Sequence, residues 1–426
     1  MTAGAGQADA DAGAITPREL YQRLAAGERV TVLDVRDRDA FERWHVEGPS
    51  VAAVQHPYAR FLAAAARDAI GEAFAAAGLD APGDGDPPVT VVCGRGEASG
   101  DVADRLDDAG IRAVNLAGGM DAWRDLAVTA DLPSAATPPD CAVVQVCRPA
   151  TGCLGYVVVA GSEAAVVDPL AAQVDEYRRI ADDHAATLRW AVDTHVHADH
   201  VSGVRALAGN DEAPGGAVSD GARVADDATP PEAVLPAGAR DRGLAYEVRT
   251  VEDGDRLTLD GGADEATATA LRAVHAPGHT SELTAFRVGD VLLSADCLFL
   301  AGVGRPDLEA ADAGARDLAA TLHETLTERF ADLPDDLLVA PGHVDRLDRA
   351  DADGRYVATL GTLRERLPVF DLETDAFVER VLADPTPRPA NYEAIVDVNL
   401  GRGSVDAETA ADLELGPNNC AVSSAD

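Results

Sequence analysis

Residues 194–200 read Thr-His-Val-His-Ala-Asp-His, so that His195, His197, Asp199 and His200 fall within six consecutive positions. Neutral imidazole and carboxylate are the ligands that zinc, non-haem iron and manganese take in proteins. Neither a hydrophobic core nor a solvated surface requires so many of these groups in one short stretch. The stretch therefore predicts a metal site, with these four side chains as candidate ligands.

The residues on either side of this stretch predict the secondary structure that holds it. Leu188, Trp190, Ala191 and Val192 form an apolar run typical of a buried strand, and residues 201–207 have a helical pattern. We expect the metal-binding stretch to leave the C-terminal end of a strand, where open α/β folds place their chemistry.

Three further candidate ligands follow, each at the end of another predicted strand. They are His279 in Ala-Pro-Gly-His-Thr, Asp296 in Ser-Ala-Asp-Cys and His343 in Ala-Pro-Gly-His-Val. Any one of them alone would be explained as a hydrogen-bonded histidine or a solvated aspartate. Together with the first four they form an ordered set, and a motif of this order is specific. We therefore expect all seven to converge on one metal centre.

The order His-x-His-x-Asp-His, then Gly-His, then Asp, then Gly-His is similar to that of the metallo-β-lactamase superfamily. The resemblance covers residues 141–367 and implies a four-layer αββα sandwich with the metal between the two sheets. The hydrophobic pattern agrees, because it predicts strands interleaved with helical stretches such as residues 313–330. The predicted strands are residues 165–167, 271–274, 291–294 and 337–340.

The N-terminal part of the chain predicts a separate domain, preceded by a small, polar tail at residues 1–15 that we expect to be disordered. Thr16, Pro17 and Glu19 then favour the start of a helix. After a turn at residues 45–48, the pattern predicts a longer helical segment up to residue 77, and a strand at residues 89–92 then leads into Cys93. A thiol between a strand and a helix meets backbone N–H groups, which lower its pKa and favour a thiolate or persulfide. The alternative is a small core residue that ends a strand.

Four segments in this region resemble a rhodanese α/β domain over residues 16–130. They are Leu-Asp-Val-Arg-Asp (33–37), His-Val-Glu-Gly (45–48), Cys-x-x-Gly-x-x-Ser (93–99) and Leu-Ala-Gly-Gly-Met-Asp-Ala-Trp (116–123). The resemblance implies that Cys93 carries the sulfane sulfur. Ala98 stands where rhodanese loops often have arginine, and Glu97 opposes Arg95 in charge. Persulfides are therefore expected to serve this domain better than thiosulfate does.

Proline-rich residues 131–140 are expected to form a semi-rigid linker between the two domains. After the metal-binding domain, residues 368–426 are expected to form a helical C-terminal extension, with helices at residues 371–382 and 391–398. Parts of this extension resemble those of bacterial members of the group, and the sequence assigns it no role.

The net charge of the chain limits the classes of partner that it can bind. The chain has 426 residues, with 74 acidic against 35 basic side chains, a formal charge of −39 and no lysine. This balance argues against nucleic acid or an anionic membrane as partner. Because the acids are spread along the whole chain, they are typical of an extreme halophile whose stability depends on salt screening. The alternative is an acidic protein adapted to one cationic partner.

Targeting signals and paired cysteines are not apparent. The sequence has no apolar run of membrane-spanning length and no N-terminal signal pattern, so we expect a cytoplasmic protein. The six cysteines lack Cys-x-x-Cys spacing, which favours free thiols over a disulfide framework. A homo-oligomer is compatible with the sequence, which does not fix the oligomeric state.

Two chemistries fit the seven candidate ligands. In a hydrolase of the glyoxalase II kind, two zinc ions per chain would activate hydroxide for attack on a thioester. One ion would be held by His195, His197 and His279, and the other by Asp199, His200 and His343, with Asp296 bridging. In a persulfide dioxygenase, one Fe(II) is held by His195, His279 and Asp296 alone, a set that leaves positions for O₂ and the substrate sulfur. The remaining four residues would then orient ligands and water.

The sequence context favours the dioxygenase. Residues 297–309 resemble the persulfide dioxygenase segment that contains a Gly-Arg-x-Asp motif, which implies that Arg305 binds a carboxylate of the thiol carrier. The alternative for Arg305 is an ion pair with Asp307. A rhodanese also handles the sulfane sulfur that such an enzyme consumes. We therefore expect a low-molecular-weight thiol persulfide and O₂ as substrates, and sulfite or thiosulfate as products.

Two questions stay open at this level. Glutathione-using members of the group have a tyrosine shortly after the last histidine, whereas His343 is followed here by Val344, Asp345 and Arg346. The identity of the thiol is therefore not fixed. A sulfur carrier or sensor with a vestigial metal site is a third hypothesis, and the seven intact candidate ligands argue against it.

Overall fold

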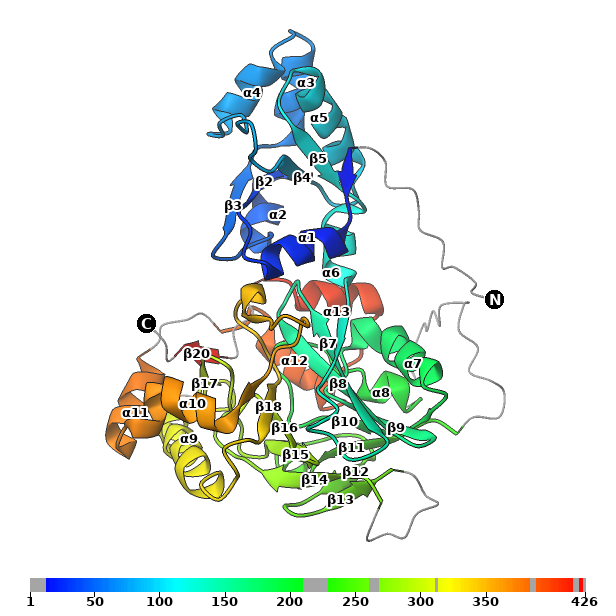
Figure 1. Cartoon of the computed structure of the whole chain (residues 1–426), viewed down its shortest axis with the longest axis vertical. Helices are drawn as coiled ribbons and strands as arrows, with labels where there is room; N and C mark the ends of the chain where they lie inside the picture. The colour runs from blue at the N-terminus through cyan, green and yellow to red at the C-terminus, as the bar shows by residue number, and fades with distance from the viewer. Residues whose placement is uncertain are drawn as a thin grey trace. The chain divides into compact units, whose positions relative to one another are not determined.

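The computed structural model describes residues 13–209, 229–259, 268–310, 313–383, 388–416 and 421–423. The chain forms two compact units. The first ends at Val128 and takes in two short later stretches, and the second comprises Thr129–Cys147, Thr151–Asp345 and the chain from Ala350 onward. Figure 1 labels the elements of both units and colours the chain from blue at its N-terminus to red at its C-terminus.

The first unit is built on a parallel sheet in the order β1-β5-β4-β2-β3. Its strands are β1 (Ala14–Ile15), β2 (Val30–Asp34), β3 (Val51–Gln55), β4 (Val89–Val92) and β5 (Ala113–Leu116). Its helices are α1 (Pro17–Ala25), α2 (Arg38–Arg43), α3 (Tyr58–Ala65), α4 (Ile70–Ala76), α5 (Glu97–Asp108) and α6 (Gly119–Asp125). The central strand β4 is buried throughout, and its sequence consists only of the β-branched residues valine and threonine, which favour strands. Helix α1 begins with the predicted capping box, in which Thr16 and Glu19 bond each other's backbone N–H.

Two expectations for this unit were wrong. Ala14 and Ile15, assigned to the disordered tail, form β1 by parallel pairing with Asn115 and Leu116 of β5. The segment up to residue 77 was expected to be helical after the turn at residues 45–48. It contains β3, because β2 offers a free edge with which β3 pairs in parallel. Helices α3 and α4 follow, separated by Asp68 in the left-handed conformation.

The second unit contains two large sheets among its described residues. One has the order β12-β11-β10-β9-β8-β7-β6, and the other β13-β14-β15-β16-β18-β19. The strands of the first are β6 (Val128–Asp131), β7 (Cys141–Arg148), β8 (Cys153–Ala160), β9 (Glu163–Val167), β10 (Thr187–Val192), β11 (Glu232–Pro236) and β12 (Arg249–Val251). Those of the second are β13 (Arg256–Thr258), β14 (Ala270–His275), β15 (Thr284–Val288), β16 (Val291–Ala295), β18 (Leu338–Pro341) and β19 (Ala358–Thr359).

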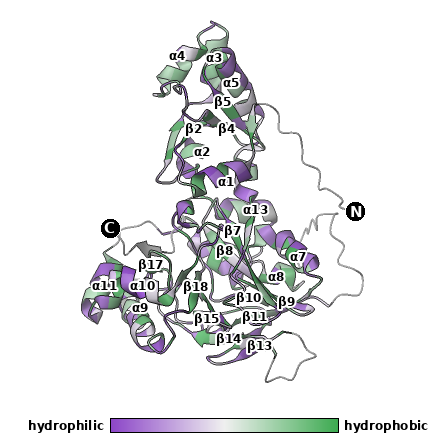
Figure 2. Cartoon of the chain, in the orientation of Figure 1, coloured by the Kyte–Doolittle hydropathy of each residue, from purple (hydrophilic) through white to green (hydrophobic). Residues whose placement is uncertain are grey.

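Helices cover these sheets. Helices α7 (Val174–Asp183) and α8 (Val204–Leu207) contact the first sheet, whereas α9 (Ala313–Glu324), α10 (Leu360–Arg366) and α11 (Thr374–Leu382) pack with the second around a common core. Apolar colour follows the strands of both sheets, and polar colour marks the outer sides of α7, α9 and α11 (Figure 2). This is the αββα sandwich expected from the sequence.

Three segments of the second unit differ from expectation. Residues 131–140, expected to be an extended linker, fold in turns onto this unit, where Ala136 O accepts a hydrogen bond from Asp290 N. The predicted helix at residues 313–330 is α9 followed by a π-helical turn at Thr325–Arg329. Residues 201–203 are not helical, and α8 begins only at Val204.

The C-terminal extension is helical only in part. After a short 3₁₀ helix at Pro368–Asp371 come α11, α12 (Tyr392–Asn399) and α13 (Ala407–Leu413). Strand β20 (Ala421–Ser423) then pairs with β17 (Gly302–Gly304), which the prediction of a purely helical extension missed. Cys420 lies outside the described residues.

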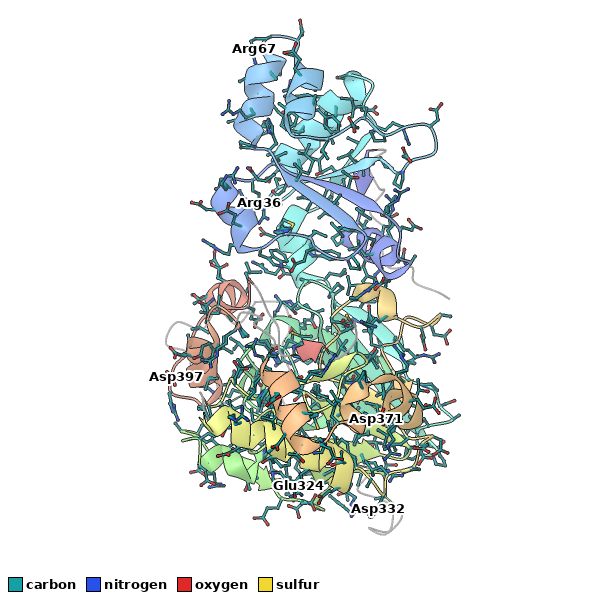
Figure 3. All side chains as sticks on the ribbon, turned by 90° about the vertical axis from the view of Figure 1, so that its left-hand side faces the viewer. Arg36, Arg67, Glu324, Asp332, Asp371 and Asp397 are labelled. Carbon is teal, nitrogen blue, oxygen red and sulfur yellow. The ribbon has the colours of Figure 1, made fainter. Side chains whose placement is uncertain are left out.

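Charged side chains project from the surface on all sides (Figure 3). Those labelled there that are exposed are Arg67, Glu324, Asp332, Asp371 and Asp397. No helix within the described ranges is both long and apolar enough to cross a membrane. Among the described residues, five cysteines form no disulfide: Cys93, Cys141, Cys147, Cys153 and Cys297.

Candidate metal centre

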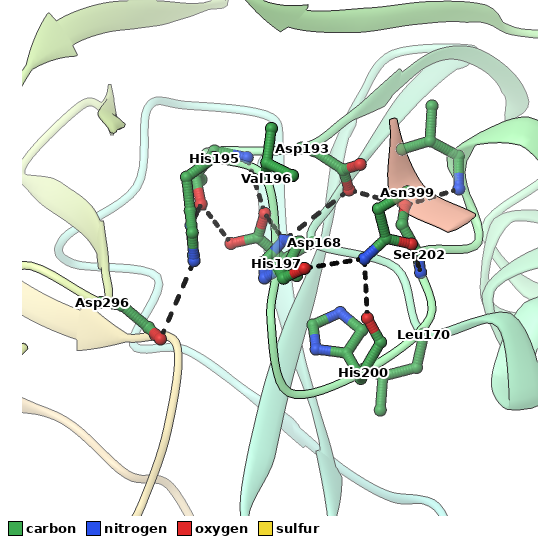
Figure 4. Close-up of polar contacts among 12 residues, drawn as sticks. Asp168, Leu170, Asp193, His195, Val196, His197, His200, Ser202, Asp296 and Asn399 are labelled. Carbon is green, nitrogen blue, oxygen red and sulfur yellow. Dashed lines mark hydrogen bonds and ion pairs between the residues drawn. The ribbon is translucent and has the colours of Figure 1, made fainter. Parts of the chain in front are cut away.

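The seven predicted ligands leave strand ends in the second unit. Residues 194–200 follow β10, and Asp296 follows β16 directly. His279 lies in the loop after β14, and His343 in the loop after β18, which pairs in parallel with β16. Because these loops extend from neighbouring strands of facing sheets, their side chains meet. Figure 4 shows His195, His197 and His200 on one loop with Asp296 opposite.

His195, His279 and Asp296 form a compact group. Their donor atoms all lie within 4.8 Å of one another, and each residue is 1% exposed. Asp296 Oδ2 is 3.9 Å from His195 Nε2 and 3.7 Å from His279 Nε2. His195 Nε2 and Asp296 Oδ2 are buried without a hydrogen-bond partner among the described residues. Unpaired buried donors and acceptors are costly unless something binds them, so this group fits a metal ion.

Hydrogen bonds behind the two histidines fix which nitrogen faces the centre. His279 Nδ1 lies 2.8 Å from Arg305 O and must donate to it, which leaves Nε2 free as a ligand. His195 Nδ1 lies 2.9 Å from Thr194 Oγ1, whose hydroxyl donates to Asp168 Oδ2 at 2.9 Å. Thr194 N also donates to Asp168. Support of this kind from groups behind the ligands raises the basicity of a metal-binding imidazole.

The charge states of the group suit a divalent cation. Burial lowers the pKa of His195 well below its ordinary value, and the nearby His197 and His279 lower it further. Burial likewise lowers the pKa of His279. Burial opposes ionisation of Asp296, but His343 more than compensates, so that the pKa of Asp296 is lowered. Two neutral imidazoles and one carboxylate are the protonation states that metal binding requires.

A second group adjoins the first. His197, Asp199 and His200 also place donor atoms within 4.8 Å of one another, and His197 Nδ1 and His200 Nε2 are buried without a hydrogen-bond partner in the described part of the chain. His343 connects the two groups, with Nδ1 2.8 Å from Asp296 Oδ1 and Nε2 2.9 Å from Asp199 Oδ2. The structure therefore brings all seven predicted side chains together in two adjoining clusters.

Small residues around Asp296 leave no room for larger ones. A Cβ on Gly342 would collide with Asp296 Oδ1, and one on Gly304 would collide with Asp296 O. Ala295, directly before Asp296, has a φ of 50°, a left-handed conformation that costs energy for a residue with a Cβ. Such strain at this position indicates that the placement of Asp296 is strongly constrained.

One buried ion pair behind the loop was missed by the sequence interpretation. Glu282, 2% exposed, accepts hydrogen bonds from Val196 N at 2.9 Å and from Arg242 Nη1 at 2.7 Å. It thereby fixes the backbone between His195 and His197. Its place directly after Gly-His-Thr-Ser was the only sequence signal that could have found it.

Arg305 is nearly buried, with 5% exposure, and adjoins the centre through its carbonyl. Its guanidinium forms two bonds to Asp307, Nε to Oδ1 at 2.8 Å and Nη2 to Oδ2 at 3.0 Å. Arg388 Nε also donates to Asp307 Oδ2, at 3.1 Å. The ion pair foreseen as the alternative is thus present, and substrate binding by Arg305 stays a prediction.

Cys93 lies in the first unit, at the C-terminal end of β4. It is 6% exposed, and its Sγ accepts hydrogen bonds from Gly96 N and Ser99 Oγ, both at 3.1 Å. The neighbouring Arg95 and Glu97 are strongly exposed and 3.9 Å apart, so they leave the loop without net charge. Neutral donors therefore surround the sulfur.

Comparison with known proteins agrees with this division. Residues 16–126 match the rhodanese-like domain, and residues 148–343 match the metallo-beta-lactamase superfamily. The human mitochondrial persulfide dioxygenase ETHE1 is 26% identical over 247 residues, which cover 57% of this chain and 80% of the human protein. An uncharacterized protein of Mycobacterium leprae is 30% identical over 200 residues, 45% of this chain and 86% of that protein.

A hydrolase and two solved structures are also similar. A hydroxyacylglutathione hydrolase of Parasynechococcus marenigrum is 28% identical over 198 residues, covering 44% of this chain and 64% of the hydrolase. The crystal structure of ETHE1 from Myxococcus xanthus aligns over 65% of this chain and 100% of its own, with 23% identity and a TM-score of 0.46. A metallo-beta-lactamase from Staphylococcus aureus aligns over 61% and 73%, with 22% identity and a TM-score of 0.49. The family matches and the two folded units together show that the chain joins an N-terminal rhodanese-like domain to a domain of the metallo-β-lactamase superfamily.

Proposed function

We propose that the protein is an iron-dependent persulfide dioxygenase that also transfers sulfane sulfur at Cys93. The reaction is RSSH + O₂ + H₂O → RSH + SO₃²⁻ + 2 H⁺. The observation that carries the proposal is the convergence of His195, His279 and Asp296 in a buried site, where His195 Nε2 and Asp296 Oδ2 have no hydrogen-bond partner among the described residues. Two histidines and one carboxylate on one face of an ion are the set that non-haem Fe(II) oxygenases use.

Iron bound there would supply O₂ activation beside the substrate sulfur. The chain's own residues would bind the iron and orient its ligands. Thr194 and Arg305 fix the ring orientations of His195 and His279, and His343 holds Asp296 Oδ1 so that Oδ2 faces the histidines. The burial of the site keeps bulk water away from a persulfide, which is readily lost to side reactions.

The comparisons support this choice over other superfamily activities. The similarity to ETHE1 covers 80% of that protein at 26% identity. The fused rhodanese-like domain supports it independently, because its chemistry uses the same sulfane sulfur. Cys93 would accept sulfur as RSSH + Cys–SH → RSH + Cys–SSH, and return it as Cys–SSH + SO₃²⁻ → Cys–SH + S₂O₃²⁻.

A two-zinc thioester hydrolase is the second candidate function. The cluster of His197, Asp199 and His200 offers two imidazoles and a carboxylate with donor atoms within 4.8 Å of one another, which is what a second ion would need. The similarity to a hydroxyacylglutathione hydrolase also favours it. The rhodanese-like domain argues against it, since thioester hydrolysis releases no sulfane sulfur.

One experiment separates the two. Protein purified without oxygen and loaded with Fe(II) in high salt is given a persulfide, and O₂ uptake and sulfite are measured with its iron and zinc content. We expect uptake, sulfite and about one iron per chain. About two zinc per chain, with thioester turnover and no O₂ uptake, would establish the hydrolase instead.

Arg305 gives a prediction about the substrate. We propose that its guanidinium binds a carboxylate of the thiol carrier by exchanging its bonds to Asp307, while Arg388 keeps Asp307 partnered. Replacing Arg305 by glutamine should raise the KM for glutathione persulfide by about 10-fold or more, the usual cost of one charge-assisted bond, with a smaller effect on kcat. A persulfide without carboxylates should show no such rise. An equal rise for both substrates would contradict a carboxylate-binding role.

A further inference from the structure

The C-terminal extension contacts the metal-binding loop through Asn399, the last residue of α12. Asn399 is 5% exposed, and its Nδ2 donates to His197 O at 3.0 Å and to His200 O at 2.9 Å. Its Oδ1 accepts from Ser202 N at 2.9 Å. One amide thus uses both donors and its acceptor on the main chain of the loop, as Figure 4 shows.

A second side chain of the extension continues this contact. Glu414, which follows α13 and is 3% exposed, accepts a hydrogen bond from Val201 N at 2.8 Å. Apolar packing accompanies these bonds, because Val398 and Ala410 cluster with Val201. Farther along α12, Tyr392 and Val396 pack against Ala198 and Leu308.

These bonds explain the conformation of the loop. Two carbonyls and two N–H groups between residues 197 and 202 have partners in the extension instead of in a helix. Buried backbone groups must be paired, and a loop that curves to aim several side chains at one point cannot pair its own. The extension therefore supplies partners for backbone groups that the loop itself leaves unpaired.

The extension also reaches the other side of the centre. Its strand β20 pairs with β17, with Val422 opposite Val303. Gly304, at the end of β17, lies directly against Asp296 O and His279 Cβ. Loop segments from both sheets of the sandwich are thus held by residues beyond 390.

We propose that Asn399 and Glu414 are positioning residues that hold residues 197–202 in the metal-binding conformation, so that the extension sets the affinity of the site for its metal. They act through the main chain of the loop and donate no ligand atom to the metal. This inference concerns metal binding and does not depend on which reaction the site performs.

The test is metal affinity in Asn399→Asp. The substitution keeps the size of the side chain and the acceptor for Ser202 N, but places a carboxylate oxygen against two carbonyls. The matched control is Asn391→Asp, because Asn391 Nδ2 donates to Leu413 O within the extension and, among the described residues, makes no hydrogen bond to the loop. Fe(II) and Co(II) are titrated anaerobically into each full-length apo protein, and the absorption spectrum of the Co(II) form is recorded.

We expect Asn399→Asp to weaken metal binding by about 10- to 100-fold, the usual cost of removing groups behind a ligand, and to change the Co(II) spectrum. Asn391→Asp should lower the melting temperature of the apo protein at least as much, with wild-type affinity. Glu414→Ala should weaken binding, and Glu414→Gln, which keeps the accepting oxygen, should restore it; this pair decides the matter if Asn399→Asp does not fold. Wild-type affinity in Asn399→Asp and Glu414→Ala, or an equal loss in Asn391→Asp, would overturn the proposal.

Discussion

Replacing Asp296 by alanine is expected to abolish O₂ consumption while Cys93 sulfur transfer stays largely intact. Asp296 provides the only carboxylate of the group formed with His195 and His279, and its Oδ2 lies 3.9 Å from His195 Nε2 and 3.7 Å from His279 Nε2. Its loss removes both a ligand and the negative charge that balances a divalent ion. The affinity for Fe(II) should fall by more than about 100-fold, the upper range for groups that lie only behind a ligand.

The measurement is metal content and O₂ uptake at saturating Fe(II), with sulfur transfer to cyanide recorded on the same preparation. Asp290→Ala is the matched control, because Asp290 lies in the turn between β15 and β16 with a side chain 67% exposed. It should leave both activities unchanged. Asp296→Asn, which keeps the volume of the side chain, guards against loss through misfolding. Undiminished O₂ uptake in Asp296→Ala would contradict the assigned ligand set, and loss of both activities would mean that the two domains do not act independently.

The candidate ligands could be predicted from the sequence because each belongs to a short local motif. A histidine-rich loop, two Gly-His pairs and an isolated aspartate are visible without knowledge of the fold, and the strands that present them have clear apolar patterns. The two-sheet sandwich was expected because the order of these motifs resembles that of the metallo-β-lactamase superfamily. What the motifs do not contain is the contact between the two clusters. His343 makes that contact, because it bonds Asp296 with one nitrogen and Asp199 with the other.

The residues that hold the loop could not be predicted because their contacts are distant in sequence. Asn399 is 202 positions from His197, and Glu414 is 213 positions from Val201. The stretch that begins at Glu414 resembles C-terminal extensions of bacterial members of the group, but that resemblance assigns it no role. A single Asn or Glu in a helical segment is ordinarily solvated. The same cause explains the error at residues 201–203. Local pattern favours a helix there, and it is overruled by partners that only the folded extension supplies.

The edges of both domains were misjudged for a related reason. Ala14 and Ile15 carry no strand signal of their own and are ordered by the free edge of β5. Proline-rich residues 131–140 have the composition of a linker, yet β6 joins the sheet of the second unit and the turns that follow bond to Asp290. Composition indicates how a segment behaves in isolation. Here the conformation of each segment is determined by the neighbouring strand with which it pairs.

Replacing Cys93 by serine is expected to abolish sulfur transfer and to leave iron content and O₂ uptake at wild-type levels. Only a thiolate can accept sulfane sulfur and hold it as a persulfide, and Gly96 N–H and Ser99 Oγ stabilise the charge on that sulfur. A serine hydroxyl in the same cradle is neutral at any pH at which the protein folds. The readout is thiocyanate formed from cyanide and a persulfide, with mass spectrometry of the intact protein to detect the added sulfur.

Two variants make this result specific. Cys141→Ser alters another buried thiol, in the second unit, and should keep full transfer and the mass increase of one sulfur atom. Ser99→Ala removes one of the two hydrogen bonds to Sγ and should slow transfer by about 10-fold, since a bond to a charged group contributes about 1.5 kcal/mol or more. If the Cys93→Ser variant still transferred sulfur, a thiol other than Cys93 would have to carry the sulfane sulfur. Loss of O₂ uptake in the same variant would mean that the persulfide reaches the metal centre only by way of Cys93, and the reaction would then be sequential instead of parallel.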